Sequence, residues 1–403
     1  MSQPQQRIPM TPDARRGRAI AQLIPLIFFR LGFMRIWKLI PRSARRRLVD
    51  RVLTTKIVRD ADRSTKAEPP FLICGLATSN TSFGWALRAT EAQLKGQGHE
   101  VATLDVSRFL NTGTSDKEPL TSSNTQNFSG RGTAILHFNP NQLNYLLSAV
   151  PPQLLSKKYL IEYCAWELEV IPKEWITWSE PVDEVWVPSA FVRDAFVRSG
   201  FKKPVRVVPH ELIKPTGVTA SRERFGLPPK AFVFLTALNI RSGMERKNVG
   251  AAIEAFGRAF AHNDNALLVV KTHDDFANPR SMRSINRLVR GRPNIRVVQD
   301  DLPEVEMWSL IASADAILSL HRAEGFGLLI LQGMMLNKPV VATGWSGNMD
   351  FMKGPLAHPV PYRLIPVDDP EGNYAGDLDA RWAEPDIDAA ARILRELAEG
   401  KIS

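Results

Sequence analysis

The 403-residue sequence holds only two cysteines, Cys74 and Cys164. Both lie in apolar, strand-like runs without CxxC or metal-ligand spacing, so we expect buried thiols in a reducing compartment. No cluster of His, Cys, Asp and Glu has ligand spacing anywhere in the chain, and we therefore predict neither a catalytic metal nor a cofactor. No small-residue cleavage site follows the first apolar stretch, so a signal peptide is not predicted.

The sequence near the N-terminus lacks an apolar run long enough to span a bilayer, which takes about 20 residues. Only 11 residues separate Arg18 from Arg30. On a helical wheel of residues 19–40, the basic side chains fall on one side and the aromatic and aliphatic side chains on the other. Pro41 ends this helix and an arginine cluster follows, within residues 42–47. The pattern therefore predicts an amphipathic helix rather than a transmembrane one.

Net positive charge is also missing from most of the chain. Residues 1–68 hold 16 basic and 5 acidic residues, whereas the remainder holds 36 and 37. This distribution argues against a nucleic-acid partner for the body of the protein. A basic helix with an aromatic face suits an anionic membrane surface, which residues 19–47 would contact. The alternative is a helix packed on the body with its basic side solvated.

The most informative stretch runs from Ala316 to Asn348. An apolar strand is followed by Glu324 and a glycine-flanked turn, and a helix extends to about Leu336. A second strand begins near Pro339. The backbone amides that open such a helix form a site for phosphate groups. A carboxylate beside them can accept hydrogen bonds from hydroxyls, so the stretch predicts a site for a sugar carried on a diphosphate.

This stretch resembles the donor-site signature of family 4 retaining glycosyltransferases, and most closely that of the bacterial capsule, exopolysaccharide and O-antigen enzymes. The resemblance rests on His321 to Leu328, Lys338 to Thr343, and Ser346-Gly-Asn. It implies that the amides of Gly325, Phe326, Gly327 and Leu328 bind the donor diphosphate and that Glu324 binds sugar hydroxyls.

One position departs from the family pattern, because Gln332 stands where a second Glu is expected. A glutamine can still hydrogen-bond a ribose hydroxyl. The departure bears on donor affinity and on the choice of nucleoside. The alternative interpretation of the whole motif is helix packing in an ordinary doubly wound domain.

The first predicted domain, residues 69–210, opens with a strand and a small-residue loop that lacks GxGxxG spacing, so a dinucleotide site is not predicted. The resemblance places Gly84 beside the donor or acceptor. It also points to Asn139, at the end of a later strand, with His137 two residues earlier. Alternation along a strand would put both on one face. The alternatives are a capping Asn and a packed His.

The segment Trp166-Glu-Leu-Glu169, followed by Pro172 and Trp175, resembles a segment of the polysaccharide-building subgroup. Trp166 and Glu167 follow a predicted strand and are candidates for binding an acceptor sugar by stacking and hydrogen bonding. Packing is the alternative role for Trp166.

The second predicted domain, residues 211–385, carries a basic loop after its first strand. Family 4 enzymes hold the donor diphosphate with an Arg and a Lys six residues apart, and Arg241 and Lys247 have that spacing. Arg246 competes for the first role. Fixed cations would stabilise the charge that the leaving nucleoside diphosphate gains. The alternative is a solvated helix start, although cations are disfavoured there.

The resemblance covers roughly residues 70–400 and implies the GT-B fold, with two Rossmann-like α/β domains facing across a cleft behind the basic leader, residues 1–68. Residues 386–403 form a last helix that is a candidate for crossing back to the first domain. The implied activity is metal-independent transfer of a sugar from a nucleotide-sugar to a growing, lipid-linked bacterial polysaccharide, with retention.

Two other functions stay open at this point. One is a nucleotide-sugar hydrolase or epimerase on the same fold. The other is a catalytically weak, membrane-bound assembly subunit, which the presence of Gln332 allows. We expect the protein to be cytoplasmic and peripheral on the inner face of the cell membrane.

Overall fold

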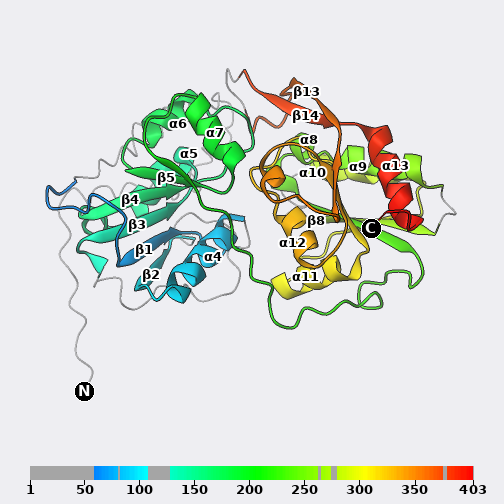
Figure 1. Cartoon of the computed structure of the whole chain (residues 1–403), viewed down its shortest axis with the longest axis horizontal. Helices are drawn as coiled ribbons and strands as arrows, with labels where there is room; N and C mark the ends of the chain where they lie inside the picture. Colours follow the sequence, from blue (N-terminus) through cyan, green and yellow to red (C-terminus); the bar gives the residue numbers. More distant parts are fainter. Residues whose placement is uncertain are drawn as a thin grey trace, which may run out of the picture. The chain divides into compact units, whose positions relative to one another are not determined.

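A computed structural model of the chain describes residues 59–79, 82–107, 128–261, 265–273, 279–374 and 379–402 (Figure 1). The predicted amphipathic helix of residues 19–40 lies outside the described residues. Within the described ranges, no helix is long and apolar enough to cross a membrane.

The first sheet has six strands in the order β2-β1-β3-β4-β5-β6. Strand order reverses between β1 and β3, as in doubly wound folds. The strands are β1 (Phe71–Gly75), β2 (Val101–Asp105), β3 (Gly132–His137), β4 (Lys158–Tyr163), β5 (Glu184–Val187) and β6 (Val205–Val207). The helices between them are α4 (Ser82–Gly96), α5 (Pro140–Ala149), η2 (Pro152–Leu154), α6 (Lys173–Trp178) and α7 (Ala190–Arg198).

The second sheet also has six strands, in the order β12-β11-β10-β7-β8-β9. Its strands are β7 (Phe232–Asn239), β8 (Ala266–His273), β9 (Ile295–Val298), β10 (Ala316–Ser319), β11 (Val340–Thr343) and β12 (Ala357–Val360). Its helices are η3 (Ile240–Ser242), α8 (Met244–Lys247), α9 (Val249–Ala259), α10 (Pro279–Val289), α11 (Glu304–Ser313), α12 (Leu328–Met335), η5 (Gly347–Asp350) and α13 (Ile387–Ala398). Strand order reverses between β7 and β10, which makes this point the topological switch of the sheet.

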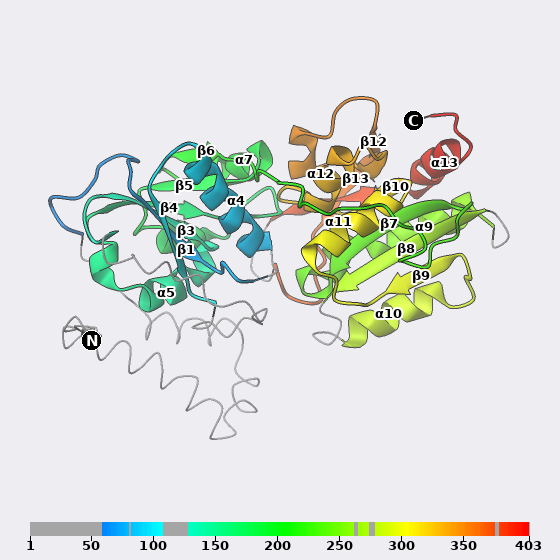
Figure 2. The same ribbon diagram turned by 90° about the horizontal axis from the view of Figure 1, so that it is seen from below.

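Helices cover both faces of the second sheet. Successive residues of each strand point to opposite faces, so each strand contributes side chains to two cores. Phe234 of β7 packs in a core that includes residues of α9, α10 and α13. Its neighbours Val233 and Leu235 pack in a second core with residues of α11 and α12. Figure 2 shows these helices around the sheet. The predicted pair of doubly wound α/β sheets is thereby confirmed.

The chain groups into two compact units that do not follow one cut of the sequence. The first contains the chain up to Cys164 together with Lys173–Trp186 and Lys203–Arg206. The second contains everything from Val207 onward. Two short segments that precede it in the sequence, Ala165–Pro172 and Val187–Lys202, also belong to the second unit.

An antiparallel hairpin, β13 (Tyr362–Pro366) and β14 (Arg381–Pro385), is added to the second unit. Its second strand contains the buried Trp382. The helix that follows, α13, packs against α9 (Figure 1). Its apolar face completes a core of the second unit. The crossing of this helix to the first domain stays a prediction.

The strands of the first sheet bury several polar side chains among apolar ones. Cys74 and Cys164 are buried free thiols, as predicted, and burial raises the pKa of Cys74 to about 12. Glu162 of β4 is also fully buried. One carboxyl oxygen accepts a hydrogen bond of 2.6 Å from the Ser179 hydroxyl, and burial raises the pKa of Glu162 to about 8. The folded protein therefore holds a proton on Glu162 that the unfolded chain releases near its ordinary value of 4.5.

We expect Glu162 to make stability fall as the pH rises from about 4.5 to about 8. Its folded pKa is raised, so the stabilising protonation is complete below the unfolded pKa and is lost above the folded one. In this window the free energy of unfolding should rise for Glu162→Gln relative to the wild type, by up to about 1.4 kcal/mol per pH unit. Urea unfolding at several pH values measures this difference, and parallel stability curves would contradict it.

Candidate functional site

The candidate site lies at the switch point of the second sheet, where β7 and β10 end. Loops leave the two strands at their carboxyl ends, and this is where open parallel sheets bind ligands. The loop after β7 leads through η3 and α8 to Asn248, and the loop after β10 runs from Leu320 to Gly327. The two loops are tied together by a backbone hydrogen bond of 2.8 Å from the Arg322 amide to the Arg246 carbonyl.

The loop after β7 is shaped by two residues in the left-handed region. Gly243 has φ of 88° and Asn248 has φ of 49°, a conformation that Gly and Asn tolerate best. The Asn239 side chain accepts a hydrogen bond of 2.8 Å from the Arg241 amide. This geometry brings Arg246 and Lys247, in the single turn of α8, to the end of the strand.

Close backbone packing shapes the loop after β10. A Cβ on Gly325 would lie 2.6 Å from the Trp166 carbonyl oxygen, and one on Gly347 would lie 2.1 Å from the Gly325 carbonyl oxygen. Both positions therefore require glycine. The Ser189 hydroxyl donates a hydrogen bond of 2.7 Å to the same Gly325 carbonyl. Gly327, at φ of 100°, then starts α12, whose first-turn amides have no helical partners.

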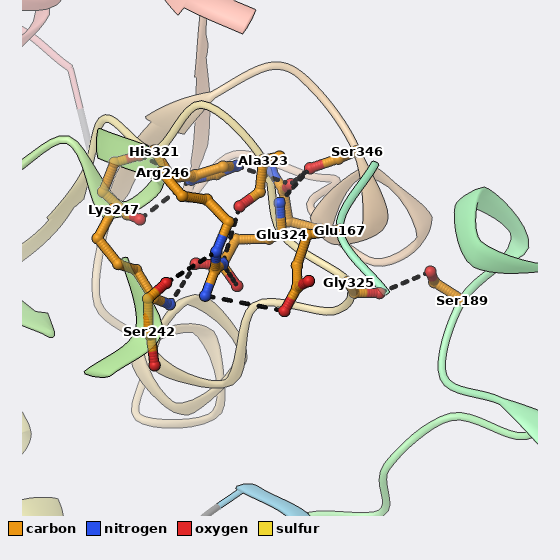
Figure 3. Close-up of polar contacts among 12 residues, drawn as sticks. Glu167, Ser189, Ser242, Arg246, Lys247, His321, Ala323, Glu324, Gly325 and Ser346 are labelled. Carbon is orange, nitrogen blue, oxygen red and sulfur yellow. Dashed lines mark hydrogen bonds and ion pairs between the residues drawn. The ribbon is translucent and has the colours of Figure 1, made fainter. Parts of the chain in front are cut away.

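Glu324 lies at the centre of a buried charge cluster (Figure 3). Its Oε1 pairs with Lys247 Nζ in a short contact, and its Oε2 lies 3.3 Å from Arg246 Nη1. The Arg246 side chain is 5% exposed and that of Glu324 is 10% exposed. Arg246 also donates to the Ala323 carbonyl at 3.0 Å and to the Ser242 carbonyl at 3.1 Å. Two cations thus surround one carboxylate.

The charges in this cluster determine its protonation. Burial by itself would raise the pKa of Glu324, but the charges of Lys247 and Arg246 outweigh it and lower that pKa to about 2. Burial also lowers the pKa of Lys247, and the Glu324 carboxylate opposes that effect. The carboxylate is therefore ionised at neutral pH and can accept hydrogen bonds from hydroxyls.

His321 and Ser346 support the backbone around Glu324. The Glu324 amide donates a hydrogen bond of 2.8 Å to the Ser346 hydroxyl, and Ser346 is held at φ of 76°. His321 is fully buried, with Nε2 3.1 Å from Asn348 Oδ1 and Nδ1 3.1 Å from the Ser319 hydroxyl oxygen. Burial lowers the pKa of His321, so the ring is a neutral structural link between two loops.

The other predicted donor residues lie in the same unit. Phe326 is 6% exposed and packs its ring against those of His210 and Phe351. Leu328 is the first residue of α12, and Gln332 is a buried residue of the same helix. Arg241 lies in η3 with an exposed side chain, whereas its competitor Arg246 is the one that contacts Glu324.

The structure places both acceptor candidates beside this cluster, within the second unit. Trp166 is 6% exposed, and its Nε1 donates a hydrogen bond of 2.7 Å to the Val170 carbonyl. Glu167 Oε1 lies 3.8 Å from Arg246 Nη2. Glu167 Oε2 accepts a hydrogen bond of 3.2 Å from Tyr374 Oη. The sequence did not point to Tyr374, because its position between β13 and β14 carries no motif. The acceptor-binding roles of Trp166 and Glu167 stay predictions.

The remaining candidates belong to the first unit. Gly84 packs in α4, where a Cβ would lie 2.2 Å from the Ser79 carbonyl oxygen. His137 is fully buried and stacks on Tyr163 with ring centroids 4.6 Å apart. Asn139 is half-buried and occupies the N-cap of α5. The prediction that residues 137 and 139 share a strand face is wrong, because β3 ends at His137.

In the described part of the chain, no three His, Cys, Asp or Glu side chains form a metal-binding group.

Removing the charge of Glu324 should leave two cations in the cluster without their shared partner. We expect Glu324→Gln to lower the free energy of unfolding by about 3 kcal/mol at pH 7. The pKa of Glu324 is depressed, so the stabilisation is present above the unfolded pKa and is lost as the pH falls toward about 2. The difference between variant and wild type should shrink by roughly half at pH 3.

Urea unfolding at pH 7 and pH 3 measures this effect. Glu254→Gln is the control, because Glu254 forms an exposed ion pair with Arg258 within α9 and such pairs contribute little. A loss for Glu324→Gln no larger than that of the control, or one independent of pH, would contradict the buried cluster.

Residues 230–375 match the family model described as "Glycosyl transferases group 1". No curated protein matches the chain in sequence. A similar solved structure is a glycosyltransferase from Rickettsia africae ESF-5, with a TM-score of 0.56 at 14% identity, covering 83% of this chain and 88% of that one.

Two further solved structures are similar over most of their length. The lipopolysaccharide outer core galactosyltransferase WaaB has a TM-score of 0.52 at 15% identity, covering 83% of this chain and 91% of that one. WaaG, a glycosyltransferase involved in lipopolysaccharide biosynthesis, has a TM-score of 0.52 at 13% identity, covering 82% and 90%. The chain thus has the GT-B fold that the sequence resemblance implied, and its residues 230–375 match the group 1 glycosyl transferase model.

Proposed function

We propose that the protein is a family 4 glycosyltransferase that moves a sugar from a nucleotide-sugar to a hydroxyl of a growing, lipid-linked bacterial polysaccharide, with retention of configuration. The observation that carries the proposal is the Lys247–Glu324 ion pair at the switch point of the second sheet. It lies within the residues that match the group 1 family. A cation for phosphate and an ionised carboxylate for hydroxyls are thus side by side.

The diphosphate, the sugar and the ribose of a nucleotide-sugar each have a proposed partner. Lys247 and the exposed Arg241 would hold the diphosphate, together with the amides of Gly325 to Leu328. Glu324 would accept hydrogen bonds from the sugar hydroxyls, and Gln332 would bind the ribose. These groups supply the positive charge that the diphosphate needs, so the proposal requires no metal.

The reaction would break the bond between the anomeric carbon and the phosphate oxygen and form one to the acceptor oxygen on the same face. Charge builds on the leaving diphosphate in the transition state, where fixed cations and amides stabilise it. The leaving phosphate would take the proton of the acceptor hydroxyl. Glu324 is held by two cations, which suits hydrogen bonding better than nucleophilic attack.

Loss of Lys247 should impair turnover more than folding. We expect Lys247→Ala to reduce kcat/KM for the sugar nucleotide by about 10²–10³-fold, the scale of one removed transition-state donor. The substrate is found first by a thermal-shift screen of the full chain with uridine, guanosine and adenosine diphosphates and their sugar conjugates. A ligand at 100 times its Kd adds about 2.7 kcal/mol of stability.

Lys230→Ala is the matched control, because Lys230 is an exposed lysine two residues before the start of β7, at the other end of the strand from Lys247. Near-normal turnover of Lys247→Ala would rule out its role. Donor loss that no acceptor accelerates would instead point to a hydrolase.

We also propose that the leader attaches the protein to the cytoplasmic face of the membrane. The excess of positive charge in residues 1–68 supports this, as does the aromatic face predicted for residues 19–40. The start of the described chain is fastened to the first unit, because Arg59 Nη2 and Arg63 Nη1 lie 2.6 Å and 3.0 Å from the two oxygens of Asp183. A leader held in this way would bring the acceptor's lipid surface to the enzyme.

Deletion of residues 1–58 tests this attachment while keeping the Arg59–Asp183 pair. The shortened chain should lose most of its binding to vesicles with anionic lipid at low salt, where electrostatic attraction is strongest. Co-sedimentation measures the bound fraction. A second variant that replaces Arg42, Arg45, Arg46 and Arg47 by Gln should bind more weakly than the wild type, with binding to neutral vesicles as the control. Equal binding by the deletion variant would refute the attachment.

A further inference from the structure

Arg246 is held on every side by groups of the protein. Its Nη1 contacts the Glu324 carboxylate and the Ala323 carbonyl, and its Nε donates to the Ser242 carbonyl. Its Nη2 faces Glu167 at 3.8 Å (Figure 3). With 5% of the side chain exposed, the guanidinium has little surface left for a ligand. Although it neighbours Lys247, Arg246 is therefore not suited to gripping a diphosphate.

Glu167 is itself held by the connection between β13 and β14. The Tyr374 hydroxyl donates a hydrogen bond of 3.2 Å to Glu167 Oε2, and the Tyr374 ring packs edge-on against Trp166 at 5.5 Å. In the same connection, Glu371 accepts a hydrogen bond of 3.2 Å from the Met244 amide, at the start of α8. The hairpin connection thus braces both Glu167 and the helix that carries Arg246.

A chain of contacts runs from Tyr374 through Glu167 and Arg246 to Glu324. A planar guanidinium with a carboxylate near each of its two terminal nitrogens is favoured in one orientation, here with Glu324 3.3 Å from Nη1 and Glu167 3.8 Å from Nη2. Fixing the guanidinium fixes which oxygen of Glu324 it engages. The other oxygen is left for Lys247 and for a ligand.

We propose that Glu167 and Tyr374 are positioning residues that hold Arg246, and through it the Glu324 carboxylate, in the orientation that the donor sugar requires. This inference rests on the proposed function and assigns Glu167 to the donor side of the site rather than to the acceptor. A change in Glu167 should therefore affect contacts to the donor sugar more than binding of the nucleoside diphosphate. Glu324 faces the sugar, whereas Lys247 and the amides of α12 face the diphosphate.

The test compares Glu167→Gln and Tyr374→Phe with Glu169→Gln in the full chain. Glu169 lies in the same segment but pairs with Arg381, so it is the matched control. We expect Glu167→Gln to lower kcat/KM for the sugar nucleotide at least tenfold and to change the Kd of the corresponding nucleoside diphosphate less than twofold. Glu169→Gln should change neither more than twofold, and Glu167→Asp should recover part of the loss.

A double variant tests whether Tyr374 acts through Glu167. We expect Tyr374→Phe to lower kcat/KM by itself about threefold to tenfold, and to have little further effect in the Glu167→Gln background. Independent effects that multiply would overturn the proposed chain of contacts. Equal losses of sugar-nucleotide turnover and nucleoside diphosphate affinity would also overturn it, because a merely structural role changes both.

A spectroscopic measurement tests the positioning independently of any ligand. The Arg246 guanidinium should rotate slowly about its Nε–Cζ bond in the wild type. NMR of the arginine side chains follows this rotation, and loss of a signal in Arg246→Lys assigns it. The rotation should become faster in Glu167→Gln but not in Glu169→Gln. Unchanged rotation would overturn the positioning role, whereas the failure of the wild type to bind any nucleotide would overturn the proposed function instead.

Discussion

The Glu324 carboxylate, shared between Lys247 and Arg246, is the interaction on which the candidate site depends. Burial alone would favour a neutral carboxyl, but the two cations hold the pKa of Glu324 at about 2. A buried ion pair of this kind contributes little to net stability relative to an apolar core, yet breaking it is costly. Its presence is therefore better explained by chemistry than by folding, since it presents a fixed negative and a fixed positive group together.

The fold explains why these charges meet. Lys247 and Glu324 are far apart in sequence, but the loops that carry them leave neighbouring strands, β7 and β10, where the strand order reverses. Glycine at positions 325 and 347 lets the backbone of one loop approach that of other segments to distances no side chain would allow. The positive φ of Asn248 ends α8 after one turn and places Lys247 beside the carboxylate. Local backbone geometry and sheet topology thus build the site together.

Much of the fold and part of the candidate site could be predicted from the sequence, because apolar strand runs bounded by Gly and Pro indicate a doubly wound sheet. The strand predicted from Ala316 is β10, and the glycine turn after Glu324 does open α12. The parts that could not be predicted depend on contacts between distant segments. Nothing in the pattern around Tyr374 indicates a link to Glu167, and the 3.8 Å approach of Glu167 to Arg246 exists only in three dimensions. The prediction that His137 and Asn139 share a strand face was wrong because β3 ends at His137, two residues before Asn139.

We propose that the cluster around Glu324 binds the sugar and diphosphate of a nucleotide-sugar. The most direct measurement is a crystal structure of the full chain with the sugar nucleotide that stabilises it most. The account predicts phosphate oxygens at Lys247 Nζ and at the amides opening α12, with a sugar hydroxyl on the Glu324 carboxylate. A nucleotide bound at another place, with the Lys247–Glu324 pair unchanged, would contradict it.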